Sequence, residues 1–277
     1  MDDLKRELIE LLGHGEMLRA ALLVGGIRDS AFNADPYLKG FETLAKGLTG
    51  GKKQRRTGPT MLVARINSAL FKKFGMAGGS GRPRLVIDDP ERFFIDRVID
   101  KRSGSPLALA ILYWALAERG GLKCECLALP SYYLLKFTEK GKDCFIDPFE
   151  GGRILSSEEF QRKFRSAFVR PGVVSTSIFE RITPMQIVAR LIQQLKQIYV
   201  LKGNSLCALR AVELLVGLFP DSPEFARDRG ILYCEMEYFS KAAEDLNYYL
   251  LKRARADDVV EIKRLSRMLK GYREVVN

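Results

Sequence analysis

The sequence predicts a helix-rich α+β fold, in which a core with a small antiparallel sheet precedes an all-α array of helical hairpins. A stretch that is apolar on every face runs from Leu107 to Ala117. Three strand-like runs follow between Lys123 and Phe149. Beyond residue 183, matching residues recur at an offset of about 34 positions. At 277 residues the chain is long enough for two domains with cores of their own.

Helices are predicted in the chain before the apolar stretch. Residues 4–47 show helical periodicity, with a break at Asp35-Pro36 where a second helix starts. Asp89-Pro90 marks the start of another helix. Between these two segments, one helix is indicated by apolar residues every four positions: Leu62, Ile66, Leu70 and Phe74.

The apolar stretch itself has clear helix boundaries. Ser105 can cap a helix, and Pro106 suits the first helical position, where no backbone N–H is needed. Gly120-Gly121 ends the helix, because glycine accepts the left-handed conformation found after helix ends. A helix without a polar face must be buried on all sides, so this one is predicted to lie at the centre of the core.

The strand-like runs after this helix predict an antiparallel sheet. They cover Lys123–Leu129, Tyr132–Thr138 and Cys144–Phe149. Residues 139–143, a polar connection that contains glycine, join the second and third runs as a hairpin. Farther on, Ser156 or Ser157 with Glu159 marks another helix start, and the basic cluster Arg162, Lys163 and Arg165 that follows is expected to be a solvated face.

The C-terminal region contains an internal repeat. The offset matches the period of tetratricopeptide repeats, in which paired helices need a small residue where their backbones approach. Asp258–Val275 is predicted to form a final amphipathic helix that covers the open end of the array. We therefore expect one domain at 1–172 and a repeat domain at 183–277. The matched pairs are Tyr199 with Tyr233, Ala208 with Ala242, Val212 with Leu246, and Leu215 with Tyr249.

Three short motifs resemble those of the SirB family of bacterial proteins. They are GSPLAL at Gly104–Leu109, LPSYY at Leu129–Tyr133 and FIDPF at Phe145–Phe149. Family members typically carry G-x-P-x-x-L, L-P-G-H-F and F-I-D-P-F at these places, and the resemblance covers roughly the whole chain. It implies a transglutaminase-like, papain-related core followed by tetratricopeptide repeats.

The chain departs from the catalytic pattern of that fold. By the resemblance, the nucleophilic cysteine position falls at Ser105 or Pro106, and the histidine position falls at Tyr132. Asp147 alone keeps its residue type. We expect Tyr132 and Asp147 to lie on adjacent strands that face the start of the Pro106 helix, with Tyr132 in the place of the imidazole and able to bond Asp147. Tyrosine, with a pKa near 10, cannot be the base at neutral pH, and a serine is not activated without one. The single histidine, His14, is far away in sequence. We therefore predict a pseudoenzyme without catalytic residues.

Composition leaves several classes of partner open. The formal net charge of +11 permits nucleic acid, anionic lipid or an acidic protein. The basic loop Lys52–Arg56 could contact such a partner, although a solvated loop is the simpler reading. We expect a non-catalytic protein-binding, scaffolding or regulatory protein. The alternatives are a nucleic-acid-binding regulator, or an enzyme of this fold with an unrecognised nucleophile.

The first helix of the repeats carries the candidate binding residues. Arg190, Gln193 and Gln197 lie on one face of that helix, and Arg227 occupies a comparable place in the second repeat. Arginine pairs with carboxylates and glutamine bonds extended peptide backbone, so an acidic peptide segment is the expected ligand.

Cysteine use and hydropathy indicate a cytoplasmic protein. The five cysteines form no C-x-x-C pair, which favours reduced thiols. The acidic, amphipathic N-terminus does not look like a secretory signal, and no apolar run is long enough to span a membrane. No cofactor and no metal site are expected, because a zinc site would need about four ligands close together.

Overall fold

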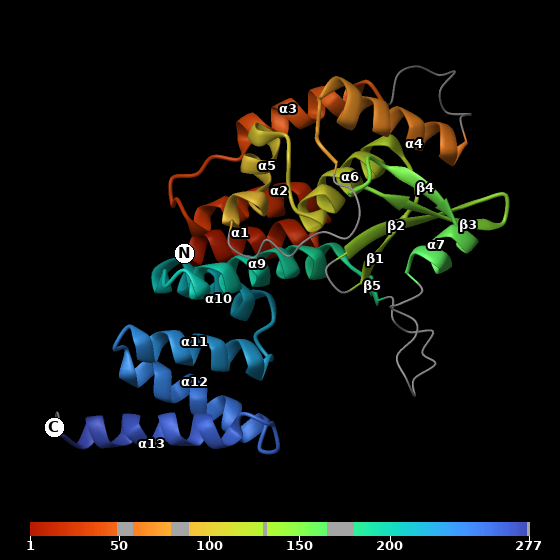
Figure 1. The fold of residues 1–277 in the computed structure, drawn as a ribbon. Helices are drawn as coiled ribbons and strands as arrows, with labels where there is room; N and C mark the ends of the chain where they lie inside the picture. The colour runs from red at the N-terminus through yellow and green to blue at the C-terminus, as the bar shows by residue number, and fades with distance from the viewer. Residues whose placement is uncertain (49–57, 79–88, 130–131, 165–179, 276–277) are drawn as a thin grey trace. The chain divides into compact units, whose positions relative to one another are not determined.

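The computed structural model describes residues 1–48, 58–78, 89–129, 132–164 and 180–275, whose helices and strands Figure 1 labels. They form two compact units, one of residues 11–191 and one of residues 1–10 with 192–277. The division falls inside two helices, α1 (Asp2–Gly13) and α9 (Pro184–Leu201). The domain boundary predicted between residues 172 and 183 touches residues outside the described ranges and stays a prediction.

The first unit is built around α6 (Pro106–Gly120). As predicted, the Ser105 side chain accepts a hydrogen bond from the Ala108 N–H, and Gly121 ends the helix at φ +80°. Each residue from Leu107 to Ala117 is at most 5% exposed, so the helix is buried on every side. Among the described residues, this unit also contains α2 (Met17–Leu23), η1 (Val24–Ile27), α3 (Asp35–Lys46), α4 (Pro59–Asn67), η3 (Ser68–Lys73), η4 (Pro90–Arg92), α5 (Ile95–Lys101) and α7 (Ser157–Lys163).

The predicted helix through Leu62 and Phe74 changes its winding halfway. α4 ends at Asn67, and residues Ser68–Lys73 (η3) continue as a π-helix. The Phe74 N–H donates to the Ala69 carbonyl at 2.9 Å, five residues back. The four-residue apolar spacing could not reveal this, because a single wide turn leaves the pattern before it unchanged.

The sheet of the first unit has five antiparallel strands in the order β4-β3-β2-β1-β5. The three predicted strands are present, but the hairpin connection is shorter than predicted. Glu139 pairs with Lys142, which leaves a two-residue turn of Lys140 and Gly141, at φ +50° and +76°. Positive φ at both positions matches the turn that the strand twist favours, so the strands run farther. The strands are β1 (Glu125–Leu129), β2 (Tyr132–Glu139), β3 (Lys142–Asp147), β4 (Arg153–Ser156) and β5 (Glu180–Ile182).

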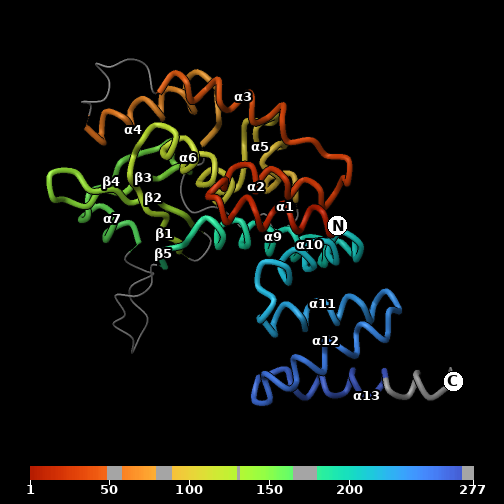
Figure 2. Tube along the Cα trace, turned by 180° about the vertical axis from the view of Figure 1, so that it is seen from behind, coloured from red at the N-terminus to blue at the C-terminus, as the bar shows by residue number. Residues whose placement is uncertain are grey.

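The second unit is all-α and contains the predicted repeat. Its helices follow one another as antiparallel layers, as the blue end of the tube in Figure 2 shows for α11, α12 and α13. Ala208 and Ala242 are fully buried, as the repeat requires. A Cβ at Gly230 would lie 2.9 Å from the Leu246 side chain, so this close approach needs glycine. After α9 come α10 (Ser205–Leu218), α11 (Pro223–Glu235), α12 (Phe239–Lys252) and α13 (Val259–Val275).

Helix α13 was predicted to cover the end of the array. Ile262 and Leu269 on it are buried, while Met268 is exposed, so the helix is amphipathic. Among the residues that the structure describes, no helix is long and apolar enough to cross a membrane.

Candidate functional site

Four side chains of the first unit meet at Asp147, the residue that the resemblance places at the catalytic aspartate position. We call Tyr132, Asp147, Glu150 and Lys163 the Asp147 cluster. Tyr132 begins β2 and Asp147 ends the neighbouring strand β3. The register pairs Leu135 with Ile146, so Tyr132 and Asp147 share one face of the sheet. Lys163 comes from the last turn of α7, and Glu150 from the connection between β3 and β4.

The Asp147 carboxylate is fully buried and both of its oxygens are engaged. The Tyr132 hydroxyl donates to Oδ2 at 2.7 Å, and Lys163 Nζ donates to the same oxygen at 2.6 Å. The backbone N–H groups of Phe149 and Glu150 donate to Oδ1, each at 3.1 Å. Asp147 thus holds the turn after β3 with one oxygen and the two side chains with the other.

Lys163 ties the cluster together. Its ammonium lies 2.7 Å from Glu150 Oε1 and 3.3 Å from the Tyr132 hydroxyl, and it sits 5.2 Å from the centre of the Tyr132 ring. Phe149 and Phe164 meet the Tyr132 ring edge-on, at 6.0 and 5.4 Å between ring centres. Lys163 therefore lies beside the Tyr132 and Phe164 rings, and charges partly removed from water need the close partners seen here.

The predicted pairing of Tyr132 with Asp147 is confirmed by the hydrogen bond between them. Burial first, and then the charge of Asp147, raise the pKa of Tyr132 above the ordinary value for a phenol. The hydroxyl therefore keeps its proton and acts as a donor to Asp147. A phenol held in this state does not accept a proton from a nucleophile at neutral pH.

Ser105 and Pro106 serve the helix that they begin. The Ser105 side chain is buried; its Oγ accepts from the Ala108 N–H at 3.2 Å, and its backbone N–H donates to the Arg92 carbonyl at 2.8 Å. Pro106 occupies the first turn of α6, where its missing N–H costs nothing. That Tyr132 and Asp147 face this helix start stays a prediction.

The role of Lys163 was missed from the sequence. Arg162, Lys163 and Arg165 read there as a solvated basic face, yet the Lys163 side chain is 23% exposed and turned inward. The signal was present in the capping box: Ser156 and Glu159 fix the start of α7. Phe160, which stacks on Phe145 at 4.0 Å, and Lys163 are three residues apart and therefore share the inward face.

Of the four candidate binding residues, the two arginines form ion pairs within the chain, and the two glutamines differ in exposure. Arg190, in the first unit, pairs with Glu180. Arg227, in the second unit, pairs with Asp258 and Asp228, each at 2.7 Å, and lies over the Tyr249 ring. Gln193 is half-buried and Gln197 is exposed. The assignment of these four residues to a binding surface stays a prediction, and the basic loop Lys52–Arg56 lies outside the described residues.

Metal-ligating side chains and cysteine thiols are the other groups that could supply chemistry. Across the described ranges, no three histidine, cysteine or acidic side chains stand close enough to hold a metal ion. His14 is exposed. Burial, and then nearby Glu118, raise the pKa of the Cys124 thiol to about 12, and burial raises that of Cys126 as well. Thiols in this state are poor nucleophiles.

Comparisons with known proteins fit this architecture. The sequence model of the Transglutaminase-like superfamily matches residues 39–193, and a tetratricopeptide-repeat model matches residues 195–267. A crystal structure of menin aligns with a TM-score of 0.35 and 11% identity over 88% of this chain and 69% of menin, and a score that low carries no argument.

Over the residues that align, curated bacterial relatives are about a quarter identical in sequence to this chain. A UPF0162 protein of Xylella fastidiosa is 27% identical over 68% of this chain and 66% of its own length, just under two thirds of that protein. The UPF0162 protein YchA of Escherichia coli is 26% identical, over 68% of each chain. Protein SirB1 of Salmonella typhimurium is 23% identical over 77% of this chain and 78% of its own. With these relatives and a superfamily match over more than half of its length, the chain belongs to the SirB family of the transglutaminase-like superfamily.

Proposed function

We propose that this protein is a non-catalytic, protein-binding member of its family, built on a transglutaminase-like core that has lost its catalytic residues. The observation that carries the proposal is the bonding of Asp147. In cysteine and serine hydrolases, the carboxylate of the triad orients an imidazole that takes the proton of the nucleophile. Here the same carboxylate bonds a protonated phenol and an ammonium, Tyr132 and Lys163.

Neither of these partners can replace the imidazole. The pKa of Tyr132 is raised, so its hydroxyl is a still weaker acid than a free phenol and stays protonated. Lys163 offers only N–H donors, and it is paired with two carboxylates, those of Asp147 and Glu150. The cluster has donors where catalysis needs an acceptor, which supports a structural role.

We expect no transglutaminase, peptidase or amidase activity from the purified protein. In the part of the chain that the structure describes, the Ser105 hydroxyl serves as a helix cap for the Ala108 N–H, so turnover of glutamine donors and amide substrates should stay at the level of a buffer blank. An active transglutaminase assayed in parallel serves as the positive control. Turnover that Tyr132→Phe or Ser105→Ala abolishes would overturn the pseudoenzyme proposal.

The tetratricopeptide repeats support a protein as partner. Repeat arrays of this kind present extended surfaces that bind other chains. On α9, Gln197 is exposed and Gln193 stands one turn before it, half-buried. Amide side chains at this spacing can donate to and accept from the backbone of an extended segment. The net charge of +11 favours a segment rich in acidic residues.

Nucleic acid ranks second as a partner. The charge is its only support, and several basic groups that the structure describes are engaged by carboxylates within the chain, as Arg227 is by Asp258 and Lys196 by Asp228. Binding of mixed nucleic acid that falls steeply between low and moderate salt would reverse this ranking.

The double variant Gln193→Ala/Gln197→Ala is expected to weaken capture of the protein partner roughly tenfold or more, since each lost hydrogen bond contributes about 1 kcal/mol. The partner is first identified by cross-linking to the wild-type chain, and binding is then measured with both purified proteins. Gln194→Ala, which changes a half-buried amide on the same helix, is the matched control and should bind normally. Undiminished binding by the double variant would move the site elsewhere, first to the Lys52–Arg56 loop.

A further inference from the structure

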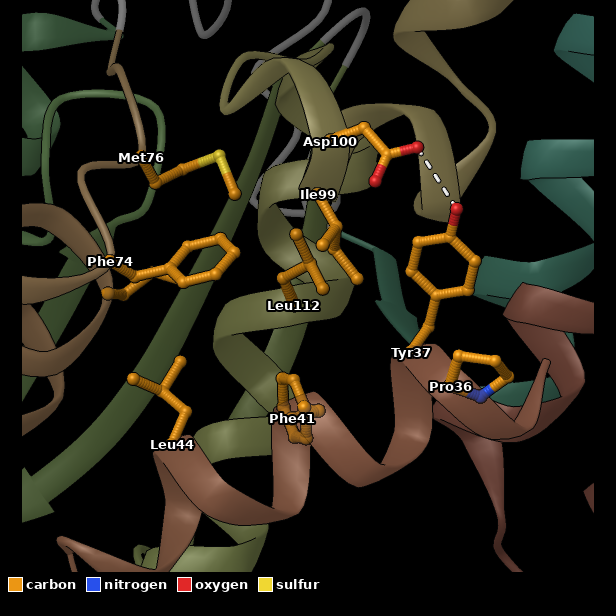
Figure 3. A pocket seen from close by; sticks show the side chains of 11 residues that line it. Pro36, Tyr37, Phe41, Leu44, Phe74, Met76, Ile99, Asp100 and Leu112 are labelled. Carbon is orange, nitrogen blue, oxygen red and sulfur yellow. Dashed lines mark hydrogen bonds between the residues drawn. The ribbon is translucent and has the colours of Figure 1, made fainter.

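The first unit contains a cavity of about 370 Å³ that the proposed function does not use. It lies between α3, the π-helical segment, α5 and α6, and its lining includes no residue of the Asp147 cluster. Most of its wall is apolar, and Figure 3 shows these side chains turned toward a common space. The principal wall residues are Phe41, Leu44, Phe74, Met76, Ile99 and Leu112.

Gly40 keeps one side of this cavity open. It sits in the middle of α3 and lines the cavity, and a Cβ built on it would meet no atom within 4 Å. Glycine inside a helix is destabilising relative to alanine, and here no close packing requires it. Gly40 is exposed, so its missing side chain leaves this side of the cavity open to solvent.

The opposite wall is held in place by an unusual backbone. π-Helical turns are rare and are found frequently at functional sites. The turn that closes on the Ala69 carbonyl positions Phe74, and the Arg102 guanidinium lies over the Phe74 ring at 5.5 Å. Arg102 itself adopts a left-handed conformation, φ +52°, and its carbonyl accepts a hydrogen bond from the Ala77 N–H at 2.7 Å. The backbone turn and Arg102 therefore hold the Phe74 ring in place.

One end of the cavity is polar and contains the Asp100 carboxylate. The Tyr37 hydroxyl donates to Asp100 Oδ2 at 3.0 Å, and Arg97 Nη1 is 3.7 Å from the same oxygen (Figure 3 shows the first contact). Within the described part of the chain, both contacts reach Oδ2, which leaves Oδ1 of this 45% exposed side chain open to a further donor. Burial first, and then the hydrogen bond to and charge of Asp100, raise the pKa of Tyr37, while the nearby Arg97 lowers it.

We propose that this cavity binds a small apolar molecule that carries a protonated amine. The apolar body packs against Phe41, Phe74 and Leu112, and the amine donates to the Asp100 carboxylate. The volume lies in the range of small-molecule sites, roughly 300–1,000 Å³. It is more than twice that of a cavity of about 150 Å³ that holds benzene, so a two-ring body fits. This inference is independent of the proposed loss of catalysis.

The test compares two probes of the same shape and opposite charge, 1-naphthylmethylamine and 1-naphthylacetate, by isothermal titration calorimetry with the full chain. For a probe of this size we expect the amine to bind with a Kd of roughly 0.1–1 mM. The acid should bind at least tenfold more weakly, because it meets Asp100 at the polar end. Equal binding of the two probes, or no binding of the amine, would refute the proposal.

Two variants, Gly40→Leu and Asp100→Asn, test whether the amine binds in this cavity. Gly40→Leu fills the open volume from within a helix that tolerates leucine, so it should abolish binding of the amine. Thr43→Leu adds the same side chain at an exposed position of α3 outside the cavity and should leave the Kd unchanged. Unaltered binding by Gly40→Leu, with a wild-type circular dichroism spectrum, would place the amine elsewhere.

The second variant, Asp100→Asn, keeps an acceptor for Tyr37 but removes the negative charge. It should lower the preference for the amine over the acid to below threefold while the cavity stays open. This variant lies at an exposed position, so it keeps the proposal falsifiable even if Gly40→Leu does not fold. A preference for the amine that persists in Asp100→Asn would overturn the assigned role of this carboxylate.

Discussion

Replacing Asp147 by alanine is expected to lower the free energy of unfolding by about 3–5 kcal/mol. The substitution leaves a partly buried ammonium, Lys163, with one carboxylate fewer, and it leaves the Tyr132 hydroxyl without its acceptor. It also removes the acceptor of the Phe149 and Glu150 N–H groups. Urea denaturation followed by circular dichroism measures the loss.

Asp143→Ala is the matched control on the same strand. Asp143 also pairs with a lysine, Lys136, at 2.7 Å, but its side chain is 43% exposed. Ion pairs in water contribute little, so this change should cost less than about 1 kcal/mol. Similar losses for the two variants would show that burial of the Asp147 cluster adds nothing to the stability of its ion pair.

Asp147→Asn separates the two roles of this side chain. Asparagine keeps an acceptor for the N–H groups of the turn but carries no charge for Lys163. If Asp147 only shaped the turn at Asp147-Pro148, asparagine would be nearly neutral and Lys163→Met would be harmless. The contacts at Oδ2 lead us to expect a loss of about 1–3 kcal/mol for each of these changes.

The elements that the sequence predicted well carry their information locally. The α6 helix has its cap, its proline and its terminal glycines in one continuous stretch, and its uniform apolarity can be satisfied only by burial. The repeats can be recognised by their sequence period. Small residues recur in them because Ala208, Ala242 and Gly230 are buried where side chains of other helices pack closely. Tyr132 and Asp147 could be paired in advance because neighbouring antiparallel strands bring them together.

The features that were missed depend on three-dimensional placement. Lys163 reads as a solvated residue in a basic run until α7 is positioned by Phe160 on the sheet. The short hairpin turn needs Lys140 at positive φ, a conformation that its residue type does not favour. The cavity is assembled from four segments between Pro36 and Leu112, and no local pattern reveals the space between them.

The second unit offers a buried ion pair of its own, between the helices of the second repeat. Arg229 of α11 donates through Nε and Nη2 to the two carboxylate oxygens of Asp245 on α12, each at 2.7 Å. Asp245 is buried, and the guanidinium also lies near the Tyr233 ring, at 5.8 Å from its centre. This two-pronged geometry gives stronger and more directional bonding than a single contact does. It joins the two helices beside the close approach at Gly230.

Asp245→Ala is therefore expected to lower the free energy of unfolding by about 2–4 kcal/mol, because Arg229 loses both acceptors at a site with little water. Glu224→Ala is the control on the same pair of helices: Glu224 of α11 meets Arg253 at the end of α12 at 2.6 Å, with both side chains about half exposed. That change should cost less than about 1 kcal/mol. Denaturant unfolding of the three proteins, followed by circular dichroism, orders them directly. If the two variants lost equal stability, the helices of this repeat would be held by apolar packing alone, and the Arg229–Asp245 pair would not determine how α11 and α12 dock.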